Sequence, residues 1–238
     1  MPGRFATRPL IARARVLAAR QESRALAVLL AGAGSLWAFL TLADEVTEGE
    51  TDAADRWLLL ALRNPADPAD PLGPRWFEEA MRDVTALGGF TLLTFTVVVA
   101  TLLLIFHDRR REALVFAATV ILAQVSSELT KALFDRDRPA LVAHGGYVYS
   151  QSFPSGHSTM AAVTFFTLAT VVASVEARKR TKALIYGLAV VFVVLVGVSR
   201  VYLGVHWPTD VAGGWALGAA WAMAAWLVLG FIRVRPRR

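Results

Sequence analysis

Three short blocks of the sequence combine histidines, a carboxylate and basic side chains at fixed spacings. They read K-x6-R-P over 131–139, P-S-G-H over 154–157 and S-R-x5-H-x3-D over 199–210. Each block lies at the edge of a long apolar run, which places its polar groups at a membrane surface. Basic side chains and backbone amides hold phosphate oxygens, and a histidine oriented by a carboxylate is a nucleophile or a proton-transfer group. The blocks therefore indicate a site that handles phosphate at a membrane surface.

The third block contains the candidate nucleophile. His206 and Asp210 are four residues apart, and Pro208 between them favours the first turn of a helix. At this spacing the carboxylate can reach one imidazole nitrogen, which leaves the other nitrogen free to attack. A lone histidine at a membrane interface is usually a hydrogen-bonded, non-catalytic ring. The presence of both Asp210 and Arg200 at these spacings favours a catalytic ring.

Three basic side chains, Lys131, Arg138 and Arg200, are the candidates for holding the phosphate oxygens. Any one of them alone could be an ordinary basic residue at a membrane interface, but that interpretation does not explain three of them beside the histidines. In the second block, Ser155 can donate a hydroxyl hydrogen bond, and Gly156 allows a close approach to the backbone. This block stands where a loop becomes an apolar helix, so free amides face an incoming phosphate.

Together the three blocks resemble the signature motifs of the type 2 phosphatidic acid phosphatase superfamily, with every signature residue present and in order. About a dozen fixed letters in three ordered blocks are far more specific than one short motif. The resemblance implies that His206 forms a phosphohistidine, and that His157 protonates the leaving oxygen and then activates water. It also implies that Ser155 and the Gly156 amide join the phosphate cradle. No metal ion or cofactor is expected, because the cations supply the charge stabilisation that a metal would provide.

Glu128 stands one helical turn before Lys131, on a similar face. An acidic residue near the membrane interior usually has a function, so we expect Glu128 to orient Lys131 or to line the substrate groove. The alternative is a carboxylate close enough to the interface to stay hydrated, and both interpretations remain open. The remaining histidines, His107 and His144, are expected to have no catalytic role.

The composition is that of a membrane protein rather than a soluble one. Of 238 residues, 55% are hydrophobic, and the mean hydropathy is +0.48, above the range of an ordinary soluble domain. The chain has no cysteine, which excludes disulfides, thiolate metal sites and a cysteine nucleophile. The net charge of +6 comes mostly from short segments beside apolar runs and so indicates membrane topology, not a nucleic-acid partner.

Six apolar runs are long enough to cross a bilayer, which takes about 20 residues in a helix. They cover 25–43, 87–106, 113–133, 156–175, 183–201 and 209–232. We therefore predict an all-α polytopic membrane protein with six transmembrane helices. Residues 1–238 are expected to form one phosphatase domain, with 113–232 as its catalytic core. The first run is long for a signal peptide and lacks a convincing cleavage site, so we expect it to be retained.

Basic residues predict the orientation of these helices, because Lys and Arg near helix ends stay preferentially in the cytoplasm. They are concentrated in 1–24, between the second and third runs, between the fourth and fifth runs, and in the C-terminal tail. Both termini are therefore expected in the cytoplasm. The acidic segment 44–86 is expected outside, and counting crossings from it places all three blocks on the same outer side.

The outer segment 44–86 is expected to contain two short helices separated by the proline-rich stretch 64–74. The first covers 55–63, and the second begins near Pro74. An apolar stripe from Trp76 to Leu87 suits a helix that lies along the membrane interface and walls the entrance to a lipid site. Packing of this helix on the bundle is an equally open alternative.

These observations predict a phosphatase that acts on a membrane lipid phosphate at the outer leaflet. Candidate substrates are phosphatidylglycerol phosphate, phosphatidic acid and undecaprenyl pyrophosphate, and the motifs do not separate them. The expected partners are the substrate lipid and the bilayer, with the oligomeric state open. A lipid transporter or scramblase that binds headgroups in the cationic pocket is the alternative. The set of His157, His206 and Asp210 speaks against it, because binding alone does not require an oriented nucleophile. Vanadium haloperoxidases share the oxyanion pocket, but six spans argue against a soluble enzyme of that kind.

Overall fold

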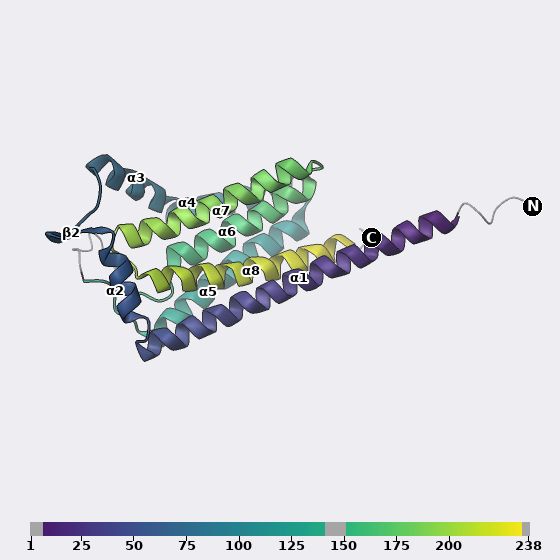
Figure 1. The fold of residues 1–238 in the computed structure, drawn as a ribbon. Helices are drawn as coiled ribbons and strands as arrows, with labels where there is room; N and C mark the ends of the chain where they lie inside the picture. The colour runs from purple at the N-terminus through teal and green to yellow at the C-terminus, as the bar shows by residue number, and fades with distance from the viewer. Residues whose placement is uncertain (1–6, 141–150, 235–238) are drawn as a thin grey trace, which may run out of the picture.

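The apolar runs fold into the long helices of a bundle (Figure 1). The computed structural model describes residues 7–140 and 151–234, with side chains described from 22 to 140 and from 151 to 233. The long helices are α1 (Thr7–Glu48), α4 (Phe90–Phe106), α5 (Arg110–Phe134), α6 (Gly156–Val175), α7 (Lys179–Tyr202) and α8 (Pro208–Val234). At 1.5 Å per residue, α5 to α8 are about 30–40 Å long, enough to cross a bilayer.

Five of these helices satisfy the length and hydropathy requirements for a membrane span: α1 from Glu22, α5, α6, α7 and α8. The sixth predicted span is α4, which has 17 residues and qualifies only together with α3 (Arg75–Ala86), to which it is bent by 43°. The prediction of an all-α, multi-pass membrane protein is confirmed. The second span begins at Phe90 rather than at 87, because Gly88 and Gly89 interrupt the helix. A Cβ at Gly88 would lie 2.4 Å from Val196 Cγ1, so close packing against α7 requires a glycine there.

Residues 44–86, which were expected outside, form a small cap at one end of the bundle after the end of α1. It consists of α2 (Asp52–Leu60), the strands β1 (Arg63–Asn64) and β2 (Asp67–Pro71), and α3. The first short helix starts three residues earlier than the predicted 55–63. The antiparallel hairpin was not predicted from the proline-rich stretch, and side-chain turn bonds account for it: Asn64 Oδ1 accepts from the Ala66 amide at 3.1 Å, and Asp67 Oδ1 from the Ala69 amide at 3.0 Å.

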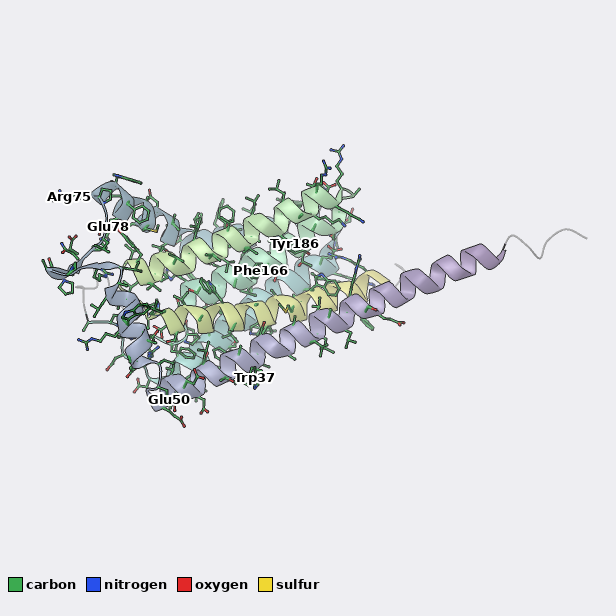
Figure 2. The ribbon with its side chains drawn as sticks, in the orientation of Figure 1. Trp37, Glu50, Arg75, Glu78, Phe166 and Tyr186 are labelled. Carbon is green, nitrogen blue, oxygen red and sulfur yellow. The ribbon has the colours of Figure 1, made fainter. Side chains whose placement is uncertain are left out.

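The cap lies at the end of the bundle opposite to the last turn of α8 (Figure 1). Helix α3 packs against α7, and Arg75 at its start is exposed, whereas Glu78 is only partly exposed (Figure 2). The predicted second short helix is therefore present, and it contacts α7. Its ring contacts include Phe77 edge-on against Tyr202, with centroids 5.2 Å apart.

Helix α6 lies inside the bundle and packs against α5, α7 and α8. Its approach to α8 depends on two glycines, because a Cβ at Gly214 would lie 2.8 Å from Ser155 O and one at Gly218 would lie 2.6 Å from Thr159 O. Small residues at four-residue spacing allow such close backbone contact in membranes. This contact holds the start of α6 beside the start of α8.

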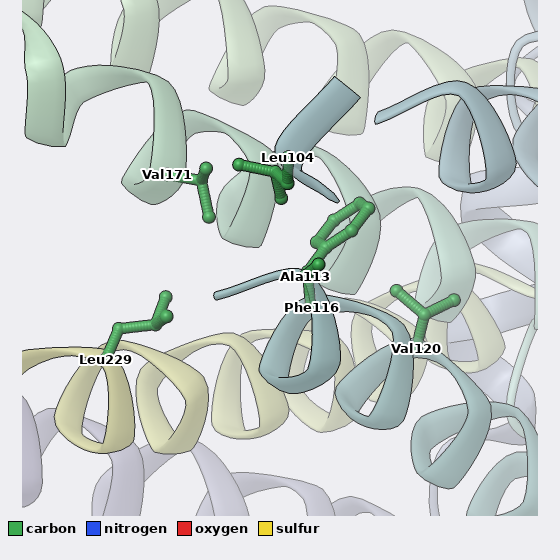
Figure 3. Packing of buried hydrophobic residues seen from close by; sticks show 6 residues of the cluster. All are labelled: Leu104, Ala113, Phe116, Val120, Val171 and Leu229. Atoms are coloured by element: carbon green, nitrogen blue, oxygen red, sulfur yellow. The ribbon is translucent and has the colours of Figure 1, made fainter. Parts of the chain in front are cut away.

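Two apolar clusters hold the ends of the bundle. One joins α4, α5, α6 and α8 through Leu104, Ala113, Phe116, Val120, Val171 and Leu229 (Figure 3). The other lies at the cap end and surrounds Phe153, which is fully buried. The Phe153 ring stacks on Phe39 of α1 with centroids 5.7 Å apart and meets Phe134 of α5 edge-on at 5.6 Å. The residue just before the P-S-G-H block is therefore anchored by two helices.

Candidate active site

The three sequence blocks meet at the cap end of the bundle. The first runs from the last turn of α5 into 135–140, the second forms the start of α6, and the third joins α7 to α8. Backbone hydrogen bonds connect them: the Ser155 amide donates to Asp210 O at 2.9 Å, and the Ser152 amide donates to Arg136 O at 2.8 Å. The three blocks therefore converge at one end of the bundle.

The candidate nucleophile lies in the short connection between α7 and α8. The chain turns at Gly204, where a φ of +72° favours glycine. His206 Nδ1 lies 3.2 Å from Asp210 Oδ2, and the two residues are 1% and 0% exposed. The Trp207 amide donates to the same Asp210 oxygen at 2.8 Å. The backbone and the imidazole therefore hold this carboxylate in one orientation.

The second imidazole nitrogen, Nε2, faces the cations. Arg138 Nη1 lies 3.0 Å from it and also donates to the Val205 carbonyl at 2.9 Å. With a carboxylate at Nδ1 and a guanidinium at Nε2, we assign the proton to Nδ1 and the lone pair to Nε2. Burial lowers the pKa of His206 to about 4, because desolvation of the charged ring outweighs the attraction of Asp210. At neutral pH the ring is uncharged and retains the lone pair of a nucleophile.

The start of α6 places free amides beside a lysine. Ser155 is the N-cap and Gly156 is the first helical residue, so the Gly156 and His157 amides have no acceptor within the helix. A Cβ at Gly156 would lie 3.1 Å from Lys131 Nζ. The ammonium group thus stands directly over the glycine backbone, and a side chain at 156 would fill the space that an anion requires.

A cavity of about 690 Å³ joins the polar groups of the three blocks. Its polar end is lined by Lys131, Arg138, Gly156, His157, Arg200 and His206. The cavity continues between α4 and α5, where Phe90, Leu93, Val97, Val98, Val120 and Ile121 line it. Concave sites with an apolar wall and a few convergent polar groups are typical of ligand pockets. The arrangement can hold a phosphate at one end and an apolar chain along the other.

Arg200 is oriented by the cap. It lies in the last turn of α7, and its Nη1 donates to Thr85 Oγ1 of α3 at 3.0 Å. Thr85 was not identified from the sequence, because it lies far from all three blocks in the chain. The contact shows that α3 does more than cover the bundle, since it sets the direction of one of the three cations.

The Ser155 hydroxyl does not line the cavity, contrary to the role expected for it. The side chain is fully buried, and its oxygen accepts from the Ser158 hydroxyl at 3.0 Å and from the Ser158 amide at 3.5 Å. Serine at an N-cap position satisfies the orphan amides of the first helical turn. In this structure Ser155 therefore shapes the start of α6, and the phosphate-facing group here is the backbone around Gly156.

Glu128 is paired with Lys131 and lies at the cavity. Its Oε1 lies 3.0 Å from Lys131 Nζ and accepts from Gln124 Nε2 at 3.0 Å, and all three side chains line the cavity. The Glu128 side chain is 50% exposed, and the Lys131 side chain is 9% exposed. The carboxylate is thus partly hydrated as well as paired.

Arg136 and Asp55 are two further residues of the site that the sequence did not reveal. Arg136 lies inside the six-residue spacer of the first block, and Asp55 lies in α2. Arg136 bonds Asp210 directly, and Asp55 contacts Arg136 and the Thr209 amide beside Asp210. The signal was weak, because one arginine among several in D-R-D-R and one acid among many in 44–86 look like ordinary surface charges.

Of the other two histidines, His107 is the C-cap of α4, at the far end of that helix from the site. His144 lies outside the described residues. Within 7–140 and 151–234, no group of three or more His, Asp or Glu side chains lies close enough together to hold a metal ion.

Comparisons with known proteins agree with these features. The family model described as PAP2 superfamily matches residues 112–233. Phosphatidylglycerophosphatase B of Bacillus subtilis is 32% identical over 199 residues, covering 81% of this chain and 90% of that protein. The undecaprenyl-diphosphatase of Sulfolobus acidocaldarius is 32% identical over 126 residues, covering 51% and 57%. The crystal structure of a transmembrane PAP2 type phosphatidylglycerolphosphate phosphatase from Bacillus subtilis has a TM-score of 0.73 and 27% identity, covering 87% of this chain and 98% of that one.

Proposed function

This chain is a membrane lipid phosphatase that belongs to the PAP2 superfamily, and we propose that it works through a phosphohistidine at the outer face of the membrane. The observation that carries the proposal is the position of His206. Its Nε2 faces Arg138 at 3.0 Å while Asp210 holds its Nδ1 at 3.2 Å. The nucleophilic nitrogen therefore opens into the same cavity as Lys131 and Gly156.

The reaction has two steps. In the first, His206 Nε2 attacks the phosphorus, and the bond from phosphorus to the leaving oxygen breaks as His157 donates a proton to that oxygen. Asp210 stabilises the positive charge that develops on the ring. In the second step His157 takes a proton from a water molecule, the water oxygen attacks the phosphorus, and the nitrogen–phosphorus bond breaks. Inorganic phosphate leaves, and both histidines return to their starting states.

The cradle stabilises the charge on the transferring phosphoryl group. Arg138 and Arg200 offer planar forks that match phosphate oxygens, and Lys131 adds a point charge over the Gly156 amide. Preorganised donors in a water-poor site contribute strongly to phosphoryl transfer. With three cations and free amides in place, the proposed reaction does not depend on a metal ion.

The substrate class follows from the apolar part of the cavity and from the relatives. A lipid tail fits between α4 and α5, where the lining is apolar. The names of the relatives described above give phosphatidylglycerol phosphate and undecaprenyl pyrophosphate as their substrates. We propose a lipid phosphate of this kind for this chain, with phosphatidic acid as a third candidate. Monoester and pyrophosphate present the same terminal phosphoryl group to His206.

The outer location rests on charge. The basic loop before α5 and the basic loop before α7 lie at the end of the bundle opposite to the site, and such loops stay preferentially in the cytoplasm. Because the chain has no cysteine, single cysteines can test this directly. An impermeant maleimide added to intact cells should label Glu79→Cys in α3 and leave Lys179→Cys unlabelled. The reverse pattern would contradict the proposed orientation.

The main test is phosphate release by purified protein in detergent with EDTA present. The panel contains phosphatidylglycerol phosphate, phosphatidic acid and undecaprenyl pyrophosphate, with His206→Ala as the test variant and His107→Ala as the matched control. We expect release by the wild type and by His107→Ala, none by His206→Ala, and a phosphohistidine detectable only when His206 is present. Equal release by His206→Ala would overturn the assigned nucleophile. Binding of headgroups without release by a folded wild-type protein would favour the transporter alternative.

A further inference from the structure

The guanidinium of Arg136 lies between two buried carboxylates. Its Nη1 is 2.9 Å from Asp210 Oδ1, and its Nη2 is 2.7 Å from Asp55 Oδ2. The side chains of Arg136, Asp55 and Asp210 are 9%, 1% and 0% exposed. Ion pairs at the surface contribute little, but removing one partner of a buried pair leaves an uncompensated charge and costs far more. Loss of Arg136 should therefore strongly affect Asp210.

The bonds to Asp210 are divided between its two oxygens. Oδ2 faces His206 Nδ1, the Trp207 amide and the Ser152 hydroxyl, while Oδ1 faces Arg136. A carboxylate held from both sides cannot rotate about its terminal bond without breaking one set of contacts. Arg136 thus fixes the rotation of the carboxylate that orients the nucleophile.

Asp55 connects the same cluster to the cap. Its Oδ1 accepts from the Thr209 amide at 2.9 Å, and its Oδ2 accepts from the Thr209 hydroxyl. Thr209 Oγ1 also accepts from Arg136 Nη1 at 2.8 Å. Asp55 therefore binds the first turn of α8 next to Asp210. Through this contact α2 helps to hold Asp210, the partner of His206, in place.

Arg136 balances the negative charges of Asp55 and Asp210 in this cluster. Burial works against its charge, but Asp210 and Asp55 outweigh that effect and raise the pKa of Arg136. The Arg136 guanidinium also lies over the Trp207 ring, 5.7 Å from its centroid. Other charged or titratable groups facing the cluster are His206, Arg138 and Arg200 on the side of the cavity and Asp52, which is 3.4 Å from Arg136, on the solvent side.

We propose that Arg136 and Asp55 are a positioning pair for the reaction, which hold Asp210 ionised and aligned with His206 and make α2 a working part of the active site. The proposal rests on the function proposed above, in which His206 is the nucleophile. Neither residue touches the cavity, so both act through Asp210.

Loss of the Arg136 charge would leave Asp55 and Asp210 as two buried carboxylates without their shared cation. Two buried carboxylates without a cation between them cannot both stay ionised easily, so one carboxyl would hold a proton at a higher pH than before. His206 would then lose its anionic partner over part of the working pH range. Removing the charge of Asp55 as well would relieve this repulsion. The double variant Arg136→Gln/Asp55→Asn therefore measures how strongly the two residues are coupled.

The test compares Arg136→Gln, Arg136→Lys, Asp55→Asn and Arg136→Gln/Asp55→Asn in the phosphate-release assay across pH. Arg136→Gln should lower kcat by about 100-fold, as expected for misalignment of a catalytic group, with KM changed less than about threefold. The acid side of its kcat profile should move to higher pH. Arg136→Lys should return the profile toward that of the wild type. Asp55→Asn should raise the kcat of Arg136→Gln by about fivefold or more, within the range of measured coupling between neighbours.

Arg63 provides the matched control. It is a buried arginine of the same cap, 2% exposed, and its Nη2 donates to Tyr202 O at 2.7 Å, away from Asp210. Arg63→Gln should lower the melting temperature and leave the shape of the pH profile unchanged. If Arg136→Gln behaves like Arg63→Gln, or if Asp55→Asn does not restore any activity to it, the positioning proposal is wrong. If Arg136→Gln does not fold, the proposal is tested by the kcat and the pH profile of kcat of Arg136→Lys and Asp55→Asn.

Failure of this proposal and failure of the proposed function give different results. An active wild type with an inactive His206→Ala variant, together with an unshifted pH profile in Arg136→Gln, would overturn the positioning role alone. Activity that survives in His206→Ala would overturn the proposed chemistry, and with it the role of Asp210 on which the positioning pair depends.

Discussion

Replacing Gly218 by alanine should separate the two helices that hold the reacting groups. Helix α8 carries Asp210 and α6 begins at Gly156, so the distance between these helices sets the distance between nucleophile and cradle. A Cβ at position 218 would lie 2.6 Å from both Ala162 Cβ and Thr159 O. Neither neighbour can move aside by a simple rotation, because one is a first side-chain carbon and the other is backbone.

The size of the effect follows from the overlap. Ordinary van der Waals contacts of a Cβ begin at 3.4 Å. To relieve the overlap, α6 and α8 must therefore move apart by about 1 Å at Gly218. Overpacking of this kind destabilises by about 1–3 kcal/mol. A displacement of about 1 Å at the chemistry can lower a rate by about 100-fold. Gly218 lies about 12 Å along α8 from Asp210, so tilting absorbs part of the shift, and we expect kcat to fall by about 5- to 50-fold.

Gly230→Ala is the control on the same helix. A Cβ there would have no neighbour within 4 Å, and alanine in place of a helical glycine stabilises by about 0.5–1 kcal/mol. Both variants are measured by phosphate release and by thermal unfolding in detergent. We expect Gly218→Ala to lose activity and melting temperature and Gly230→Ala to keep both. Equal behaviour of the two variants would refute the argument that close packing of α6 on α8 sets the geometry of the site.

Three further outcomes follow from the geometry. Gly156→Ala should raise KM for the lipid phosphate by about tenfold or more while the protein still folds, because its Cβ would lie 3.1 Å from Lys131 Nζ in the space for the phosphate; binding of inorganic phosphate checks this. Glu128→Gln should lower kcat by about two- to fivefold, since its carboxylate is half exposed and such a pair contributes little; unchanged turnover and lipid preference would remove Glu128 from the site. The imidazole of His206 should titrate near pH 4, not 6.5, and be neutral above that, which is measurable by NMR with His206→Gln for assignment.

The sequence was sufficient to identify the proposed reacting groups, because their recognition depends on residue type and short spacing. His206 and Asp210 are four residues apart at a helix start, so local geometry alone brings them into contact. The long apolar runs predicted the spans for a similar reason, since a bilayer requires about 20 apolar residues whatever surrounds them. The boundary between α3 and the second span was predicted at 87, and the structure places it at Gly88 and Gly89; the close contact of Gly88 with Val196 is visible only in the tertiary structure.

The supporting contacts required the tertiary structure. Ser155 could have turned its hydroxyl toward either the cavity or the helix start, and only the surroundings of Ser158 decide between them. Arg136 and Asp55 are separated by 81 residues, and no periodicity or spacing connects residues so far apart in the chain. Their contact exists because α2 folds back onto the first turn of α8. Local physics therefore determines which groups are proposed to react in this protein, and long-range packing determines how they are held.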